Sequence, residues 1–276
     1  MSLPSANDQT LTNGCQIPKV SWLVCAHFSS MQLKDALQSC LNQTFSDFEL
    51  LVIANGGKAN EVVSSAREWF GTDSRVRIIS TPIQHFTFSL SLGIHYAKGQ
   101  FIARMDADDI VYSFRLEKQY QFFENNPDLV ILGTAYDLID LDGLVVGTIY
   151  PPQSDRKIHQ ELLFRNPICH PSMMMRKQVL LDAGGYLGVL QAEDYDLWLR
   201  LSSNPRNRFA NLSDVCMAYR NNGAEARGSR LAYASQGASQ FGYFLMGRGW
   251  QWIFAAGISL AKVLRIRFRK LLGLVR

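Results

Sequence analysis

The chain has 276 residues, and its 47% hydrophobic content is enough to build the core of one large or two small domains. The cysteines are five in number, scattered and without CxxC spacing; they are Cys15, Cys25, Cys40, Cys169 and Cys216. This pattern excludes a disulfide framework and a cysteine-based zinc site, and it fits a reducing cytoplasm.

The net charge of +4 conceals an uneven distribution along the chain. Residues 1–225 hold 19 Lys/Arg and 24 Asp/Glu, a net of −5, whereas residues 226–276 hold 9 Lys/Arg and no acid, a net of +9. We interpret this as an acidic body with a basic tail that has a separate role. Residues 1–18 are polar, show no signal peptide, and are expected to form a flexible lead-in.

Strand and helix patterns alternate over the first hundred residues. Apolar strand-like runs cover Val20–Cys25, Phe48–Ala54, Val76–Ile79 and residues 100–105, and helical spacing covers Met31–Leu41, Glu61–Phe70 and Phe88–Ala97. This order predicts an α/β, Rossmann-like fold with a mostly parallel sheet and helices on both faces. Ligands of such folds bind at the carboxyl ends of the strands.

Three carboxylates follow the strand at residues 100–105, namely Asp106, Asp108 and Asp109. Acids packed this closely repel one another unless a cation lies beside them. Asp106 and Asp108 can both reach one hard divalent ion, Mg²⁺ or Mn²⁺, and such an ion can hold the diphosphate of a nucleotide. Acids also cap helices after strands, so Asp109 is equally suited to capping a turn.

The second half continues with a helix from Arg115 to Phe123, short strands at Leu129–Gly133, Ala135–Ile139 and Met173–Met175, and a helix from Gln178 to Ala183. A further helix begins with Glu193, Asp194 and Asp196. The helix dipole favours carboxylates there by about 0.3–1 kcal/mol each without any catalysis. Alternatively, one of them faces the metal site across a cleft and acts as general base.

Five segments in register resemble family 2 glycosyltransferases of the GT-A fold. They are residues 42–50, 99–109, 115–119, 170–172 and 192–200, and the similarity extends from about residue 19 to about residue 221. The resemblance implies a GT-A domain at 19–225, with a nucleotide-binding half at 19–110 and an acceptor half at 111–225. Residues 226–276 then form a basic amphipathic helical tail.

The resemblance implies an inverting transferase that uses a nucleotide-sugar donor, with uridine diphosphate as the default, and Mn²⁺ or Mg²⁺. The acceptor would be a hydroxyl of a saccharide or lipid-linked saccharide in bacterial surface-polysaccharide assembly. Asp106 and Asp108 match the DxD motif, with Asp108 as metal ligand and Asp106 contacting the metal or the ribose. Asp194 matches the general base. His170, Arg104 and Arg220 would contact the donor, although Arg104 and Arg220 also suit structural ion pairs.

The chain departs from the family pattern at the nucleotide site. Cys25 and His27 stand after the first strand, where the family usually has a Pro/Thr-x-Tyr-Asn pattern, and Asn55 stands where an acid normally grips the nucleoside. Asn55 can still donate and accept a hydrogen bond. We therefore assign Cys25, His27 and Asn55 to the donor site and expect an unusual nucleotide pose or a lower donor affinity.

The tail predicts a surface helix. Trp250–Ala261 is apolar but is shorter than the roughly 20 residues that span a bilayer. Lys262, Arg265, Arg269 and Arg276 fall on one helical face, opposite a largely apolar face. This predicts binding to an anionic membrane surface, and a cytoplasmic protein peripheral to the inner membrane. The alternative is packing on the catalytic domain; no nucleic-acid partner is expected.

Two other functions remain open from the sequence. A nucleotidyltransferase also uses an α/β sheet with metal-binding carboxylates, but Cys25–Ser30 has neither the glycines nor the cation of a phosphate loop. A catalytically weak scaffold subunit would explain the altered Ala54-Asn55 turn, whereas the retained Asp108 and Asp194 oppose it.

Overall fold

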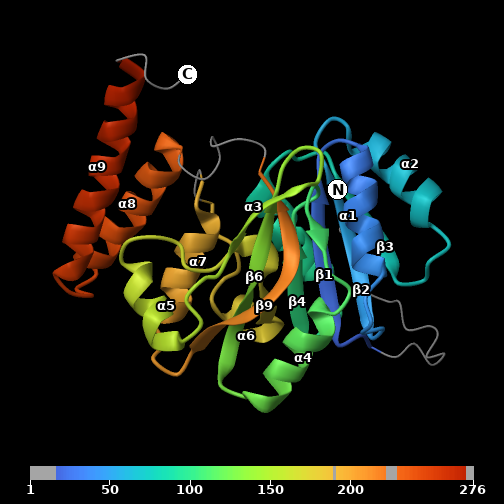
Figure 1. Ribbon diagram of the computed structural model, residues 1–276, viewed down its shortest axis with the longest axis horizontal. Helices are drawn as coiled ribbons and strands as arrows, with labels where there is room; N and C mark the ends of the chain where they lie inside the picture. The colour runs from blue at the N-terminus through green and yellow to red at the C-terminus, as the bar shows by residue number, and fades with distance from the viewer. Residues whose placement is uncertain (1–16, 189–190, 222–228, 272–276) are drawn as a thin grey trace, which may run out of the picture.

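The computed structural model describes residues 17–188, 191–221 and 229–271. Within these residues a 9-stranded sheet runs in the order β3-β2-β1-β4-β8-β6-β9-β5, with β7 beside β6. Helices cover both faces of this sheet, and two C-terminal helices lie at the edge of the molecule opposite α1 and α2 (Figure 1). The predicted α/β architecture is confirmed.

The amino-terminal half is a parallel sheet, as the alternating patterns predict. Its strands are β1 (Val20–Ala26), β2 (Phe48–Asn55), β3 (Val76–Thr81) and β4 (Phe101–Met105), connected by α1 (Met31–Leu41), α2 (Ala59–Phe70) and α3 (Phe86–Tyr96). Trp22 packs with the face that α1 and α2 cover, and Leu23 with the face that α3 covers. Because both faces of β1, β2 and β4 are buried, these three strands are mostly apolar.

The carboxyl-terminal half mixes strand directions. Its elements are β5 (Ile110–Val111), α4 (Arg115–Asn125), β6 (Leu129–Ile139), β7 (Val145–Ile149), α5 (Asp155–Leu162), β8 (Met174–Arg176), α6 (Lys177–Asp182), α7 (Glu193–Ser202) and β9 (Arg208–Arg220). β8 runs antiparallel to β4 and β6, whereas β6 and β9 are parallel. The prediction of two short strands over 129–139 is wrong, because β6 continues through register shifts opposite β9.

A buried arginine holds the middle of the sheet together. Arg115 is fully buried and lies 5.0 Å from the ring centroid of Trp22. Its guanidinium donates to the carbonyl oxygens of Pro171 (2.9 Å), Arg104 (3.0 Å) and Met173 (3.1 Å). Helix α4 therefore fixes the end of β4 against the turn that precedes β8.

The C-terminal hairpin consists of α8 (Arg230–Leu245) and α9 (Gln251–Leu271), which pack side by side (Figure 1). Buried Gln240 of α8 donates to the Leu163 carbonyl (3.0 Å) and the Tyr195 hydroxyl (2.9 Å), and accepts from Ser259 of α9 (2.8 Å). The hairpin is thus bonded to the segment after α5 and to α7. No helix in the described ranges combines the length and apolarity needed to cross a bilayer.

Candidate active site

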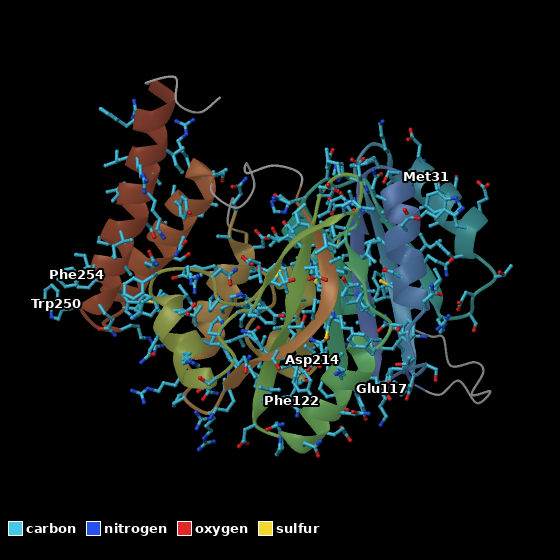
Figure 2. The ribbon with its side chains drawn as sticks, in the orientation of Figure 1. Met31, Glu117, Phe122, Asp214, Trp250 and Phe254 are labelled. Carbon is cyan, nitrogen blue, oxygen red and sulfur yellow. The ribbon has the colours of Figure 1, made fainter. Side chains whose placement is uncertain are left out.

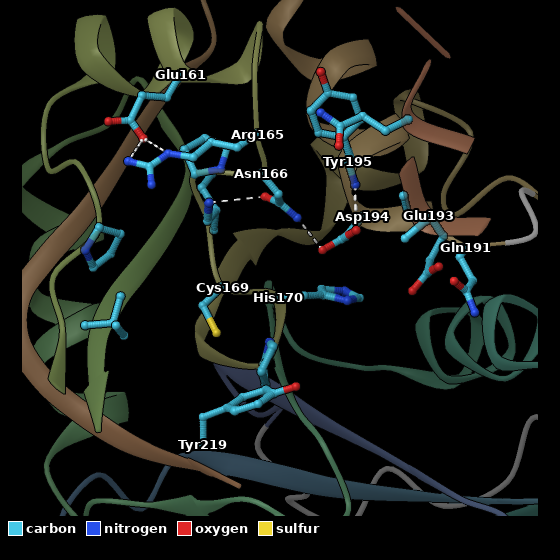
Figure 3. A pocket seen from close by; sticks show the side chains of 18 of the residues that line it. Glu161, Arg165, Asn166, Cys169, His170, Gln191, Glu193, Asp194, Tyr195 and Tyr219 are labelled. Atoms are coloured by element: carbon cyan, nitrogen blue, oxygen red, sulfur yellow. Dashed lines mark hydrogen bonds and ion pairs between the residues drawn. The ribbon is translucent and has the colours of Figure 1, made fainter. Parts of the chain in front are cut away.

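A cavity of about 630 Å³ lies beyond the carboxyl end of β4. Its walls include Arg104 of β4, Asp106 directly after β4, His170 from the turn before β8, Glu193 and Asp194 from α7, and Tyr233, Gln236 and Lys262 from the C-terminal hairpin. Figure 3 shows His170 and Asp194 projecting into the same space. The fold therefore brings the neighbouring residues Arg104 and Asp106 together with His170 and Asp194, which are distant from them in the sequence.

Asp194 is held by two hydrogen bonds at the start of α7. Its Oδ1 accepts from the Tyr195 backbone N–H at 2.7 Å, and its Oδ2 accepts from Asn166 Nδ2 at 2.6 Å (Figure 3). The residue before the helix, Ala192, has a left-handed backbone with φ of 68°. Such a conformation is costly for a residue other than glycine, and strain of this kind is concentrated at functional sites.

Burial and the neighbouring Glu193 charge raise the pKa of Asp194 to about 6. The bonds from Tyr195 and Asn166 and the charge of Arg104 act in the opposite direction. A carboxylate with this pKa is ionised at neutral pH yet is more basic than an ordinary aspartate. Asp194 is therefore suited to accept a proton from a hydroxyl bound in the cavity.

His170 is buried and carries no charge at neutral pH. Burial and the nearby Arg104 lower its pKa well below 6.5. Its Nε2 hydrogen-bonds the Tyr186 hydroxyl at 2.6 Å, and its ring lies edge-on to Phe86 and Trp198. His170 can therefore offer a ligand a hydrogen bond or a ring surface, but not the positive charge that would bind a phosphate.

Arg104 supplies positive charge to the wall of the cavity. Its guanidinium forms an ion pair with Asp106 and lies 5.2 Å from the ring centroid of Phe86. Arg104 Nε is buried without a hydrogen-bond partner in the described part of the chain. Arg104 is thus both the structural ion-pair residue and the cavity cation that the sequence left as alternatives.

The acidic loop after β4 carries excess negative charge. Burial, together with the charges of Asp106 and Asp108, raises the pKa of the Asp109 carboxyl well above its usual value. Its Oδ1 accepts from the Arg220 backbone N–H at 2.8 Å, and its Oδ2 is buried without a partner among the described residues. Asp109 therefore anchors the loop, while Asp106 and Asp108 are its more exposed acids.

These residues fit a divalent cation that a ligand helps to bind. Asp106 and Asp108 provide hard carboxylate oxygens, and Mg²⁺ is commonly bound by one or two carboxylates plus substrate phosphates. In the described ranges no group of three or more His, Cys, Asp or Glu side chains is arranged to hold a metal by itself. Phosphate oxygens would thus have to complete the coordination.

Residues 21–185 match the family model of Glycosyl transferase family 2. The chain belongs to glycosyltransferase family 2. It is therefore a glycosyltransferase, and the alternative of nucleotidyl transfer is not supported.

A curated relative and solved structures agree with this assignment. The chain is 38% identical over 215 residues to the O-antigen biosynthesis glycosyltransferase WbnJ of Escherichia coli, which covers 78% of this chain and 84% of that protein. S. aureus TarS in complex with UDP-GlcNAc has a TM-score of 0.59 at 17% identity, over 89% of this chain and 81% of that chain. The Pyrobaculum calidifontis mannosyltransferase PcManGT, in complex with GDP-Man and Mn²⁺, has a TM-score of 0.62 at 13% identity, over 95% and 82%. The structural likeness confirms the predicted GT-A fold.

Five predicted site residues do not line the cavity of this family 2 enzyme: Cys25, His27, Asn55, Asp108 and Arg220. The Asn55 amide donates to the Ala26 carbonyl at 3.2 Å and thereby joins the ends of β1 and β2. Burial raises the pKa of the Cys25 thiol to about 12, so it stays protonated. The His27 side chain is exposed to solvent, and its ring lies edge-on to the ring of Phe28. Their donor role stays a prediction.

Arg220 positions the acidic loop from β9. Its side chain donates to the backbone carbonyls of Asp108 (2.9 Å), Asp140 (3.0 Å) and Leu141 (3.0 Å). These bonds hold the chain at Asp108 against the turn between β6 and β7. Of the two roles that the sequence left open for Arg220, these bonds give it a structural one, and its contact with the donor stays a prediction.

Several cavity residues of the glycosyltransferase were absent from the sequence prediction. Asn166 lies 28 residues before the carboxylate that it binds. Tyr186, which bonds the cavity residue His170 from outside the lining, lies 16 residues after it. Gln236 and Lys262 come from the tail, which had been considered separate from the catalytic site. No short motif signals these contacts, because helix and loop packing creates them.

Proposed function

We propose that this enzyme transfers a sugar, with inversion, from a nucleoside-diphosphate donor to a hydroxyl of a saccharide or lipid-linked acceptor in surface-polysaccharide biosynthesis. The observation that carries the proposal is the shared cavity, which has the basic carboxylate of Asp194 on one wall and the Arg104–Asp106 pair on another. The O-antigen role in the name of the WbnJ relative supports the polysaccharide class.

The chemistry would be a single displacement. Asp194 accepts the proton of the acceptor hydroxyl as the oxygen attacks C1 of the donor sugar, and the bond from C1 to the diphosphate breaks. Asn166 and the Tyr195 N–H hold the carboxylate in place for this transfer. When bound by Asp106 and Asp108, a divalent ion would stabilise the negative charge on the departing diphosphate.

A uridine diphosphate sugar remains the default donor. Among the structural neighbours, TarS forms a complex with UDP-GlcNAc and PcManGT a complex with GDP-Man and Mn²⁺, so the nucleobase of the donor differs within this fold. Asn55 stands where the resemblance implies an acid. We therefore expect a weaker or differently oriented hold on the nucleoside than an acid would provide.

A donor screen tests the function directly. We expect thermal stabilisation of the full chain by one series of uridine, guanosine or thymidine diphosphate sugars in the presence of Mn²⁺. Asp108→Ala should weaken this binding at least about tenfold, because a carboxylate ligand of the ion is lost. Asp182→Ala removes an exposed acid at the end of α6 and should change nothing.

A response that does not require Asp108 would overturn the metal assignment. The absence of any donor response from a folded protein would favour the scaffold alternative, with its nucleotide pocket lost near Asn55. Both results can be read from the same melting curves.

We also infer that the C-terminal hairpin binds the anionic surface of the inner membrane. Trp250 and Phe254, which are 72% and 71% exposed, project from the tip of the hairpin (Figure 2). The surrounding sequence, residues 226–276, carries nine cations and no acid. Exposed aromatic groups beside cations are typical of interfacial membrane binding. Of the predicted basic face, Arg276 lies outside the described residues.

Flotation with vesicles tests the membrane surface. The double variant Trp250→Ser/Phe254→Ser should bind vesicles containing phosphatidylglycerol at least about tenfold less than wild type, because two buried aromatic rings are lost from the interface. The control is Leu141→Ser/Leu144→Ser, which removes two comparably exposed apolar groups from the turn after β6. Equal binding by wild type and both variants would exclude the hairpin tip as the contact.

A further inference from the structure

One buried amide of the C-terminal hairpin is bonded to two segments of the catalytic domain. Gln240 of α8 is fully buried, and its Nε2 donates to the Leu163 carbonyl (3.0 Å) and to the Tyr195 hydroxyl (2.9 Å). Its Oε1 accepts from the Ser259 hydroxyl of α9 at 2.8 Å. Because a carbonyl oxygen can only accept, the bond to Leu163 determines which end of the amide carries the N–H groups. Each polar group of the Gln240 side chain therefore has a partner.

The two acceptors of Gln240 lie beside the two groups that hold the Asp194 carboxylate. Tyr195 supplies the backbone N–H that Asp194 Oδ1 accepts at 2.7 Å. Leu163 lies three residues before Asn166, whose Nδ2 donates to Asp194 Oδ2 at 2.6 Å (Figure 3). One amide thus joins the segment that holds the first carboxylate oxygen to the segment that holds the second.

Three successive carbonyl oxygens at the end of α5 are bonded by side chains of other helices. The bonds run from the Tyr195 hydroxyl to Leu162, from Gln240 to Leu163 and, at 3.0 Å, from Lys262 to Phe164. A surface loop normally leaves such groups to water, which imposes no fixed geometry. The position of Asn166, two residues beyond this run, is therefore set by α7 and by the hairpin.

We propose that Gln240 is a positioning residue for the general base: through Tyr195 and the segment that leads to Asn166, it holds the Asp194 carboxylate in the geometry needed for proton transfer. This inference rests on the proposed function and adds the C-terminal hairpin to its machinery. Gln240 is not among the residues that line the cavity, so it acts through these groups and not on the substrate.

Titration of the Asp194 carboxyl group in the full chain, without donor or metal, tests this role. The probe is the carboxyl carbon of ¹³C-labelled aspartate, and the signal that Asp194→Asn removes is assigned to Asp194. The bonds from Asn166 and Tyr195 favour the ionised carboxylate. Gln240→Met keeps the volume of the side chain and removes both N–H donors, so it should raise the titration midpoint by at least about 0.5 pH unit.

Ser259→Ala is the matched control. Ser259 is as buried as Gln240, and the substitution removes only the bond to Gln240 Oε1, which leads to neither support of Asp194. The ionisable groups near Asp194 are Glu193 of α7, Arg104 of β4 and the Tyr186 hydroxyl, and neither variant alters them. Ser259→Ala should therefore weaken the packing of the hairpin and still titrate as wild type does.

Tyr195→Phe examines the same set of bonds from the other side. It removes the hydroxyl that accepts from Gln240 but keeps the backbone N–H that is bonded to Asp194. The midpoint should again rise, and the double variant Gln240→Met/Tyr195→Phe should shift it by less than the sum of the single shifts, because both substitutions break one connected set of bonds.

The hydrolysis rate of the donor that the thermal screen selects, with water as acceptor and Mn²⁺ present, gives a second readout. This rate should fall about tenfold in Gln240→Met, because a misplaced base accepts a proton less efficiently. Donor binding should be unchanged, since Arg104, Asp106 and Asp108 are not bonded to the hairpin in the described part of the chain.

The proposal is overturned if the midpoint of Gln240→Met stays at or falls below the wild-type value, or if Ser259→Ala raises it equally. If Gln240→Met does not fold, which loss of donor binding would reveal, the midpoint of Tyr195→Phe decides in the same way. Normal titration and hydrolysis in Gln240→Met, together with lost hydrolysis in Asp194→Asn, contradict this inference alone. Full hydrolysis in Asp194→Asn contradicts the proposed function.

Discussion

Asp194→Asn is expected to lower the rate of sugar transfer about 10²–10⁴-fold, the range typical of a lost general base. The amide cannot take the acceptor proton, although its oxygen can still accept the Tyr195 N–H bond. Donor affinity should stay within about twofold of wild type, because transition-state stabilisation and donor binding are separate quantities. Single-turnover transfer and donor titration on the same protein measure the two effects.

The pH dependence of transfer reports the same group. Because the pKa of Asp194 is raised to about 6, the rate should rise with pH through about 6 and then level as the carboxylate becomes ionised. Burying this charge also costs stability above that pH, so the melting temperature of Asp194→Asn at pH 8 should not fall below that of wild type. Near-full transfer by Asp194→Asn would show that another group is the base.

Glu193→Gln is the matched control for this experiment. Glu193 lies beside Asp194 at the start of α7, and its negative charge raises the pKa of the Asp194 carboxyl. The substitution should therefore keep transfer and move the midpoint of the pH profile downward. A midpoint that does not move would mean that a different group controls the profile.

Arg115→Met is expected to destabilise the fold by about 3 kcal/mol, because three buried carbonyl oxygens lose their charged donor. Those oxygens belong to Arg104, Pro171 and Met173, so the loss falls on the segments that carry the cavity residues. Urea unfolding measures the stability. Arg115→Lys should recover part of the loss, since the ammonium group can donate to some of these carbonyls.

Arg176→Met is the comparison for that experiment. Arg176 also donates to a backbone carbonyl, that of Leu129 at 2.8 Å, and its guanidinium lies about as close to an aromatic ring, 5.3 Å from the Phe101 centroid. Unlike Arg115 it is only partly buried, so water can replace its bonds, and we expect a cost below about 1.5 kcal/mol. An equal loss of stability in Arg115→Met and Arg176→Met would mean that Arg115 stabilises the sheet no more than a partly buried arginine does.

Local sequence patterns predicted most of the amino-terminal half. β1, β2 and β4 are buried on both faces, so each is a mostly apolar run that stands out from its neighbours. β9 was not predicted, because polar residues such as Ser213 and Asp214 interrupt its apolar pattern. Burial of a strand on two faces leaves a strong signal in composition, whereas a half-exposed strand leaves a weak one.

The motif acids were predictable for a different reason. Asp106 and Asp108 crowd the end of a strand, and Asp194 begins an amphipathic helix, so each carries a local signal of its own. The surroundings of these acids in the folded protein have no such local signal in the sequence. The Asn166 bond to Asp194 and the elevated pKa of that carboxyl depend on how the loop after α5 packs against α7.

The C-terminal tail shows most clearly that contacts made by packing cannot be predicted from local sequence patterns. Composition and periodicity were enough to predict that residues 226–276 are basic and that part of them is helical and amphipathic. That Gln236 and Lys262 share a cavity with Asp194, across 42 and 68 residues of chain, follows from how the helices pack. Charge and periodicity are properties of a segment alone, but a shared cavity is a property of side chains from several elements packed together, and no segment encodes it separately.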